Sequence, residues 1–326
     1  AAQAIAELAR QDVPDEVTDA YHGKKLHYGK NYIIPAPFDP RLISFVSSAV
    51  AKAAIDTKVA KKVFANIETY KSELTGRINP IASILEPIKS SIKGQNKKVV
   101  FAEGEAENTI RAALSFFNSG FGTPILIGRE TRIKENMAKV NLDGLENLII
   151  HNARLSDKNQ KYIDNLYQKL HRKGHLKRDC QKLINQDRNV FAAAMVSAND
   201  ADAMVTGVTR PFRRCFNDVI KVIDPIKNEA FLSMSMLVSK ERTVFIGDVN
   251  IHESPTQIEI ADIACGIART VKNLGYEPRV ALLSFSNFGN PPNLKSETIK
   301  NTLEILLKRK VNFEFDGEMS AETALD

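Results

Sequence analysis

The sequence predicts an α/β protein whose short buried strands form a largely parallel sheet with helices on both faces. Beyond about residue 78, short apolar runs alternate with stretches in which apolar residues recur at helical spacing. Continuous apolar runs are typical of strands buried on both faces, and strands separated by helices pair in parallel through right-handed crossovers. Ligands bind such sheets beyond the carboxyl ends of the strands, so the turns that follow the strands are the candidate binding loops.

The apolar runs predict strands at residues 98–102, 124–128, 148–150, 203–205, 231–234, 243–246, 280–284 and 311–315. Helical periodicity predicts helices at residues 107–118, 162–170, 189–198, 256–274 and 295–307. The alternation of the two sets favours an α/β fold over an all-α or all-β fold.

The beginning of the chain differs from the remainder, so we predict two domains, residues 1–78 and residues 79–326. Residues 61–80 carry few large apolar side chains and contain Gly76 and Pro80. This change in composition places the domain boundary at about residue 78.

Within the first predicted domain, residues 2–10 have the pattern of a short helix that ends before a break at Pro14. Three prolines within residues 35–40 exclude a regular element there. Apolar residues then recur at helical spacing over residues 41–60, with Asp39 as a possible cap.

Composition and charge exclude several classes of protein. Hydrophobic residues make up 43% and charged residues 26% of the chain, as in soluble globular proteins, and no apolar run reaches the ~18 residues of a membrane span. The three cysteines are odd in number and widely spaced, which favours a reducing, cytoplasmic setting over a disulfide framework. The six histidines form no zinc-ligand pattern, so no metal site is predicted.

The net charge of +6 is modest, and no nucleic-acid-binding motif accompanies it. We therefore expect a small anionic molecule as the ligand, and neither nucleic acid nor a membrane as a partner.

The first candidate binding loop follows the strand at residues 203–205 and contains Thr206, Gly207, Thr209, Arg210 and Arg213. Glycine permits close approach of the backbone, threonine hydroxyls donate to oxyanions, and arginine offers a planar fork that suits phosphate. The pattern favours an anion-binding loop, with an ordinary helix start and solvated arginines as the alternative.

The second candidate loop follows the strand at residues 280–284 and contains Ser284, Ser286 and Asn287 within a polar run that ends at Pro292. Such donors can hold a phosphate or a developing oxyanion, although the same composition is common in loops of no special function. Asp316 and Glu318 follow the last predicted strand and offer two carboxylates to a cleft.

A third turn places Glu103, Glu105 and Glu107 at the entrance of a helix. Carboxylates at this position interact favourably with the helix dipole, so we favour helix capping over catalysis for them.

Several of these segments together resemble phosphate acetyltransferase, the enzyme that interconverts acetyl-CoA and phosphate with acetyl phosphate and CoA. The matching segments occur in order, from about residue 80 to the end, as V-V-F-A-E-G-E-A-E, T-P-I-L-I-G, D-A-M-V-T-G, G-D, Y-E-P-R-V-A-L-L-S-F and D-G-E. The resemblance implies a two-domain phosphotransacetylase-like fold, which is also that of isocitrate and isopropylmalate dehydrogenases.

The first 75 residues resemble the end of the cofactor-binding domain of bacterial malic enzymes, through Val13-Pro14-Asp15, Y-I-I-P and F-D-P-R-L. Large NADP-dependent malic enzymes carry a phosphate acetyltransferase-like domain at the C-terminus. The chain is therefore expected to be a segment of such a fusion, truncated at both ends. For the parent, the resemblance implies oxidative decarboxylation of malate to pyruvate with NADP and Mg²⁺ or Mn²⁺, and a homo-oligomer.

The second loop departs from the free-standing transferases, because Asn287 and Asn290 stand where those enzymes have Thr and Ser. The resemblance also places the transferase's Ser-Arg pair and nearby Asp beyond Asp326, and the malic enzyme's catalytic residues before Ala1. We therefore expect no catalytic residue and no cofactor in this segment, but a regulatory site for acetyl-CoA or CoA. An active phosphate acetyltransferase and an oligomerisation scaffold are the alternatives.

Overall fold

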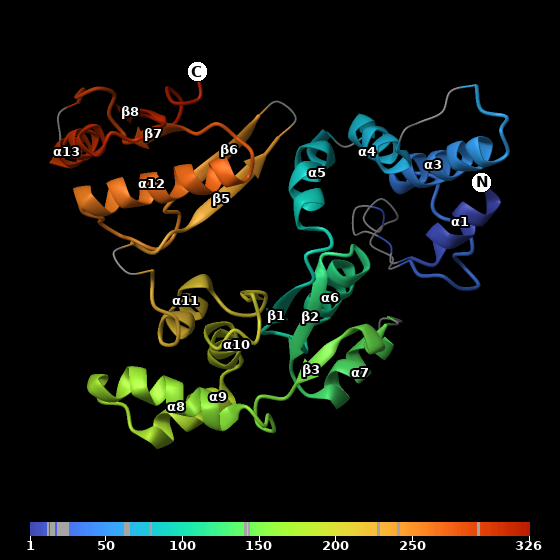
Figure 1. Ribbon diagram of the computed structural model, residues 1–326, viewed down its shortest axis with the longest axis horizontal. Coiled ribbons are helices and arrows are strands. Elements are labelled where there is room, and N and C mark those ends of the chain that lie inside the picture. Colours follow the sequence, from blue (N-terminus) through green and yellow to red (C-terminus); the bar gives the residue numbers. More distant parts are fainter. Residues whose placement is uncertain are drawn as a thin grey trace. The chain divides into compact units, whose positions relative to one another are not determined.

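The computed structural model describes residues 1–11, 13, 17, 26–61, 66–78, 80–139, 142, 144–226, 229–239, 242–291 and 294–326. Pro14 and Asp15, which contribute to the predicted break and to the resemblance, and Pro292 in the second loop lie outside the described residues. The chain divides into two compact units, Ala1–Ile223 and Asp224–Asp326 (Figure 1). The predicted boundary near residue 78 was based on a change of composition and of family resemblance, not on compactness. It stays a prediction.

The first unit contains most of the helices. In chain order its helices and strands are α1 (Ala2–Ala9), α3 (Arg41–Asp56), α4 (Ile67–Ile78), α5 (Pro80–Ile92), β1 (Lys97–Phe101), α6 (Glu107–Asn118), β2 (Gly122–Ile127), α7 (Glu130–Lys139), the 3₁₀ turn η1 (Leu145–Asn147), β3 (Ile149–His151), α8 (Asn159–Leu170), the 3₁₀ turn η2 (His171–Lys173), α9 (Lys177–Gln186), α10 (Arg188–Ser197), β4 (Ala203–Val205) and α11 (Phe212–Ile220).

The four strands described in this unit form one parallel sheet in the order β3-β2-β1-β4. Side chains of successive strand residues point to opposite faces, so each strand contributes to two cores. Phe101 and Leu126 lie in the core formed with α6 and α7, whereas Val100 and Ile125 lie in the core formed with α8, α9 and α10. Both faces of the sheet are covered, as the continuous apolar runs predict.

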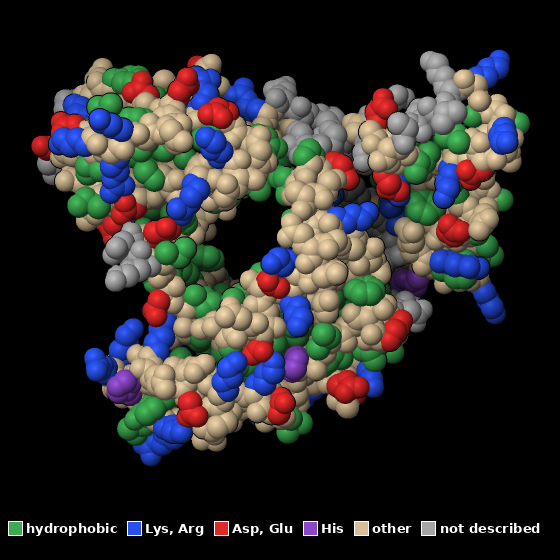
Figure 2. All heavy atoms as spheres, viewed as in Figure 1, with side chains coloured by type: hydrophobic (Ala, Val, Ile, Leu, Met, Phe, Trp, Pro, Cys, Tyr) green, Lys and Arg blue, Asp and Glu red, His purple; other side chains and the backbone are tan. Residues whose placement is uncertain are grey.

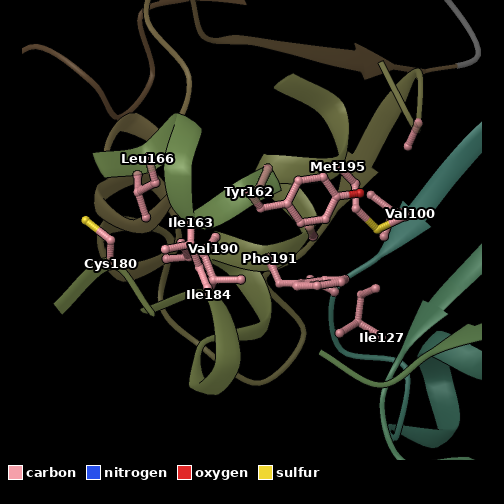
Figure 3. Close-up of a cluster of buried hydrophobic side chains, with 14 of the residues drawn as sticks. Val100, Ile127, Tyr162, Ile163, Leu166, Cys180, Ile184, Val190, Phe191 and Met195 are labelled. Carbon is pink, nitrogen blue, oxygen red and sulfur yellow. The ribbon is translucent and has the colours of Figure 1, made fainter. Parts of the chain in front are cut away.

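The larger core of the first unit is centred on two aromatic rings (Figure 3). Tyr162 of α8 and Phe191 of α10 meet edge to face, with ring centroids 5.5 Å apart and an interplanar angle of 76°. The Tyr162 hydroxyl donates to Asp200 Oδ2 at 2.7 Å, so the polar end of the buried ring is paired. This core anchors α10, whose first residue, Arg188, donates a hydrogen bond to Thr209 of the first candidate loop.

The helices at the start of the chain pack on one another in sequence, α1 on α3, α3 on α4 and α4 on α5. Asp39 is buried and accepts the backbone N–H of Arg41 at 2.9 Å, and its carboxylate also pairs with the Arg41 side chain. Asp39 therefore binds the first residue of α3, as the predicted cap would, although Pro40 is the residue that precedes the helix.

The second unit contains β5 (Met234–Val238), β6 (Thr243–Gly247), α12 (Gln257–Asn273), β7 (Arg279–Leu283), α13 (Leu294–Arg309) and β8 (Glu314–Met319). β5 and β6 form an antiparallel pair, and β7 and β8 form a parallel pair. Buried residues of α12, β7 and α13 form its core, with Leu306 fully buried. The first turn of α12 is closed by a capping box, in which Thr256 and Glu259 each bind the other's backbone N–H.

Three details of the second unit refine the predictions. The pair β5–β6 is antiparallel, an exception to the largely parallel arrangement that was predicted. The strand predicted at residues 231–234 begins later than expected, since β5 begins at Met234. Leu232, before the strand, packs its side chain closely against Gly266 of α12. The last strand begins later than predicted, at Glu314, so Asp316 and Glu318 lie within β8 rather than after it.

The basic surface of α8 and α9 is offset locally by acidic side chains. Lys177 pairs with Asp164 at 2.7 Å, and Lys158 pairs with Asp200 at 2.6 Å. On the face drawn in Figure 2, Lys and Arg side chains over these helices are interspersed with Asp and Glu side chains.

We expect Phe191→Ala to lower the free energy of unfolding of the first unit by about 3–5 kcal/mol, because it removes a fully buried ring and leaves a cavity. Leu155→Ala is the matched control, because Leu155 is 81% exposed, and its effect should stay within about 0.5 kcal/mol. Urea unfolding of the two variants measures the difference. Equal stabilities would contradict the packing described for this core.

Candidate functional site

The loop between β4 and α11 contains the predicted binding residues of the first unit. β4 pairs in parallel with β1, so this loop lies beside the turn that follows β1. That turn contains Glu103, whose side chain is only 1% exposed. A buried carboxylate needs hydrogen bonds or opposite charge to offset the loss of hydration, and the loop after β4 supplies both together with Arg188.

We define Glu103, Arg188, Gly207, Val208 and Thr209 as the Glu103 cradle. The backbone N–H groups of Gly207 and Val208 donate to Glu103 Oε2 at 3.1 and 2.5 Å. The backbone N–H and the hydroxyl of Thr209 donate to Oε1 at 2.9 and 2.5 Å, and Arg188 Nη2 donates to it at 3.3 Å. Gly207 has φ of +106°, a conformation suited to glycine, in the stretch where the N–H groups converge on the carboxylate.

The hydrogen bonds of the cradle outweigh the cost of burying the carboxylate. Burial by itself would raise the pKa of Glu103, but the hydroxyl and N–H of Thr209, the N–H of Val208 and the charge of Arg188 hold that pKa below its ordinary value. The loop therefore has the donors that an anion requires, and the anion that it binds in this structure is the chain's own carboxylate. Whether Gly207 and Thr209 also bind an external ligand stays a prediction.

The remaining predicted residues of this loop have different surroundings. Arg210 Nη1 binds both carboxylate oxygens of Asp187, at 3.1 and 3.0 Å, and Asp218 Oδ2 at 3.4 Å. Thr206 Oγ1 donates to Asn189 Oδ1 at 2.8 Å inside the unit. Arg213 is exposed on the first turn of α11. Arg210 thus links the starts of α10 and α11.

The capping interpretation of the acidic turn is wrong for Glu103, because that side chain binds the loop after β4 instead of the start of α6. Glu107 does lie in the first turn of α6, where it pairs with Arg111 at 3.2 Å. Glu105 binds Arg129 at 3.0 Å and Arg132 at 3.2 Å, which joins this turn to the start of α7. Burial would raise the pKa of Glu105, but hydrogen bonds from both arginines lower it to about 2.

The second candidate loop, between β7 and α13, is arranged in the same way. Glu318 of β8, which pairs with β7, is 1% exposed. Its Oε1 accepts the backbone N–H of Gly289 at 2.8 Å and the hydroxyl of Ser296 at 2.7 Å. Hydroxyl contacts of 3.2 and 3.1 Å extend this network from Ser296 to Ser286 and from Ser286 to Ser284. We define Glu318, Gly289, Ser296, Ser286 and Ser284 as the Glu318 cradle.

Burial by itself would raise the pKa of Glu318, but the Ser296 and Ser286 hydroxyls, the Gly289 N–H and the charge of Lys300 hold it below its ordinary value. Each unit therefore contains a buried glutamate next to the strand that precedes a candidate loop, and each glutamate binds donors of that loop.

Asn287 and Asp316 lie apart from the hydrogen bonds of the Glu318 cradle. Asn287 Oδ1 accepts the backbone N–H of Ser320 at 2.7 Å and the hydroxyl of Thr323 at 3.2 Å, so its amide oxygen holds the turn after β8. Asp316 is exposed and accepts the N–H of its neighbour Gly317 at 2.8 Å. Ser284, Ser286 and Glu318 are thus brought together, whereas Asp316 is not part of their network.

Sequence reasoning missed Arg188, Asp187, Asp218 and Ser296. Asp187 had a local signal, because an aspartate directly before a helical run is typical of a helix cap, and its side chain accepts the N–H groups of Asn189 and Val190. Arg188 and Ser296 had no such signal, since their partners Glu103 and Glu318 are distant in the sequence. Asp218 had none either, since it meets Arg210 only when the loop after β4 is folded. Within the described residues, no group of three or more His, Cys, Asp or Glu side chains is arranged to hold a metal ion.

A family model described as "Phosphate acetyl/butaryl transferase" matches residues 83–326. The chain belongs to this transferase family. The match includes both cradles, so the two buried glutamates and their loops lie within the family's domain. Among the described helices, none combines the length and apolar character that crossing a membrane requires.

Curated relatives place this transferase domain in two settings. The chain is 46% identical over 327 residues to an "NADP-dependent malic enzyme" of Rhizobium meliloti, a match that spans all of this chain and 43% of that protein. It is 28% identical to a "Phosphate acetyltransferase" of Clostridium acetobutylicum, over 74% of this chain and 75% of that protein. The chain thus spans less than half the length of the malic enzyme, and the predicted resemblance to the transferase portion of such enzymes is confirmed.

Solved structures agree with the family assignment. The structure titled "Crystal Structure of a Phosphotransacetylase from Streptococcus pyogenes" matches with a TM-score of 0.66 and 25% sequence identity, over 74% of this chain and 76% of that one. "EutD phosphotransacetylase from Staphylococcus aureus" matches with a TM-score of 0.65 and 25% identity, over 74% of this chain and 73% of that one. The phosphotransacetylase-like α/β fold is therefore confirmed, while the comparison with isocitrate and isopropylmalate dehydrogenases stays a prediction.

We expect Glu103→Gln to loosen the loop after β4, because an amide cannot accept all the hydrogen bonds that the carboxylate accepts. Hydrogen exchange at the backbone of Gly207, Val208 and Thr209 should become about tenfold faster or more, which corresponds to the loss of one hydrogen bond to a charged group. Glu146→Gln, at an exposed position, is the control. Unchanged exchange at all three amides would show that the cradle does not hold the loop.

The lowered pKa of Glu105 predicts a specific pH dependence of stability. A carboxylate whose pKa falls on folding stabilises the protein above its ordinary pKa of 4.5, and this contribution is lost as the pH falls toward about 2. Glu105→Gln should therefore show a smaller loss of unfolding free energy than the unmodified chain between these pH values. Because both arginines are more than half exposed, we expect a difference of about 1 kcal/mol or less.

Urea unfolding at a series of pH values measures this effect, with Glu130→Gln as the control because Glu130 and its partner Lys134 are both exposed. If Glu105→Gln and the unmodified chain lose stability in parallel, the ion pairs with Arg129 and Arg132 contribute nothing to it.

Proposed function

We propose that this chain is the phosphotransacetylase-like module of a NADP-dependent malic enzyme and that it binds acetyl-CoA or CoA as a regulatory ligand. In this proposal residues 1–78 are the end of the malic enzyme's cofactor domain. The parent oxidises and decarboxylates malate to pyruvate with NADP and Mg²⁺ or Mn²⁺, is a cytoplasmic homo-oligomer, and needs no cofactor in this segment. Similarity to malic enzymes along the whole chain supports this setting.

The regulatory role is supported by one observation: the hydrogen-bond donors of both loops bind carboxylates of the chain itself. Transition-state stabilisation requires donors aimed at the position where charge develops in the substrate. In the first loop the N–H groups of residues 207–209 are directed to Glu103, and Arg210 is bound to Asp187 and Asp218. In the second loop the N–H of Gly289 is directed to Glu318. Loops held in this way can form fixed walls of a binding site more readily than they can neutralise a reacting phosphate.

The amide at position 287 supports the same role. The oxygen of Asn287 is occupied by Ser320 and Thr323, and its side chain is larger than the hydroxyl that the free-standing transferases were expected to carry here. Binding can survive such a change when catalysis does not, because a displacement of about 1 Å in the reacting groups can cost ~10²-fold in rate.

An active phosphate acetyltransferase is the second candidate. It is supported by the match to the Clostridium acetobutylicum enzyme. That match covers 75% of the enzyme, whereas the match to the Rhizobium meliloti malic enzyme covers 43% of that protein. In that reaction the CoA thiolate attacks the carbonyl carbon of acetyl phosphate, the carbon–oxygen bond to phosphate breaks, and phosphate leaves with the electron pair.

Two assays on one preparation of the malic enzyme that carries this chain separate the candidates. We expect little or no acetyl phosphate from acetyl-CoA and phosphate, and a change in malate affinity of roughly 5- to 150-fold when acetyl-CoA is added, the usual range of allosteric coupling. Thr209→Val should weaken the acetyl-CoA response, whereas Thr131→Val, at an exposed position in α7, should not. Rapid acetyl phosphate formation with malate kinetics indifferent to acetyl-CoA would reject the regulatory role.

A further inference from the structure

Arg188, the first residue of α10, uses only part of its guanidinium group in the Glu103 cradle. Its Nη2 donates to Glu103 Oε1 at 3.3 Å and to the hydroxyl oxygen of Thr209 at 2.5 Å. In the part of the chain that the structure describes, neither Nε nor Nη1 makes a hydrogen bond. An arginine carries five N–H donors, so three of them remain for another acceptor.

The two unused nitrogens of Arg188 differ in burial. Nε is fully buried, and a buried N–H group without an acceptor is unfavourable because it has lost its hydration. Nη1 is not among the fully buried atoms that lack a partner, and 32% of the side chain is exposed. The side chain is thus held in place by Nη2, while an acceptor can reach Nη1 from solvent.

Positive charge exceeds negative charge around Arg188. Glu103 already accepts three backbone N–H groups and one hydroxyl from the loop after β4, so Arg188 is only one of its partners. Asp187 and Asp218 are bound by three other cations, Arg210, Arg214 and Lys221. Four cations therefore meet three carboxylates, and a surplus of this kind favours an anionic ligand.

Arg188 lies at the edge of the sheet where α/β proteins bind ligands. Through Glu103 and Thr209 it contacts the turn after β1 and the loop after β4, and these two strands are parallel neighbours. Among the described residues, no atom apart from its chain neighbours lies within 4 Å of the position that a Cβ would take at Gly207. The backbone of the loop therefore adjoins open space.

Arg210, which the sequence favours as an anion-binding residue, has its charge met internally. Its Nη1 binds both oxygens of Asp187 and Oδ2 of Asp218. Arg188 instead shares a single carboxylate, that of Glu103, with the donors of the loop. An external anion therefore meets less competition at Arg188 than at Arg210.

We propose that Arg188 binds a phosphate group through Nη1 and thereby sets the affinity of this site for phosphate-bearing molecules. A guanidinium group donates charge-assisted hydrogen bonds to phosphate oxygens in its own plane. Inorganic phosphate and the phosphate groups of CoA offer the same acceptors, and binding makes and breaks no covalent bond. For CoA the inference rests on the proposed function, whereas for inorganic phosphate it does not.

Calorimetric titration of the malic enzyme that carries this chain tests the assignment, with inorganic phosphate and CoA as separate probes. We expect Arg188→Gln to weaken phosphate binding about tenfold or more, the effect of one lost hydrogen bond to a charged group. Arg178→Gln, at an exposed position of α9, is the control and should bind phosphate as the unmodified protein does.

A second variant separates phosphate binding by Arg188 from support of the loop by Arg188. Glu103→Gln also removes a hydrogen bond of the cradle, but it leaves Arg188 in place and takes away a negative charge beside it. Phosphate affinity should therefore rise rather than fall, because an anion gains from the loss of a like charge. A comparable loss of phosphate affinity in both variants, or unchanged binding of both probes in Arg188→Gln, overturns the inference.

The two probes also separate this inference from the proposed function. Weakened CoA binding in Arg188→Gln identifies CoA as a source of the phosphate group, and weakened binding of inorganic phosphate alone identifies the free anion. If the unmodified protein binds phosphate but not CoA, the regulatory proposal fails and the role of Arg188 is decided by phosphate. Failure to bind either probe overturns both.

Discussion

The buried carboxylate of Glu103 is the interaction on which the arrangement of the first unit's candidate loop depends. A charge removed from water must be met by hydrogen bonds or by opposite charge, and here three backbone N–H groups, one hydroxyl and Arg188 meet it. The loop supplies these donors with Gly207 at positive φ. One side chain located beyond β1 therefore binds the N–H groups of three consecutive residues on the path from β4 into α11.

The second unit also contains a buried glutamate that binds donors of a neighbouring loop. Glu318 lies on the strand next to β7, and the loop after β7 folds around it through Gly289 and Ser296. Parallel pairing explains the recurrence, because the carboxyl end of each strand adjoins the loop that leaves its neighbour. Two loops rich in donors are thereby bound to buried carboxylates of their own units.

The sequence by itself determined the elements whose signals are local. The predicted bounds of α6 and β4 agree with the structure, since helical spacing and short apolar runs are set by neighbouring residues. It also indicated both donor-rich loops and the transferase family. It did not predict the antiparallel pairing of β5 with β6, because pairing depends on contacts between distant segments.

Only the tertiary structure decided what the loop donors bind. In the sequence Glu103 stands four residues before Glu107, a position typical of an acidic residue near the start of a helix. Its partners in the loop after β4 lie more than 100 positions away. Which strand neighbours β1 determines which loop receives the carboxylate, and the order of strands in a sheet is set by packing of the whole unit. The chemistry of the donors is therefore local, but the identity of their anion is not.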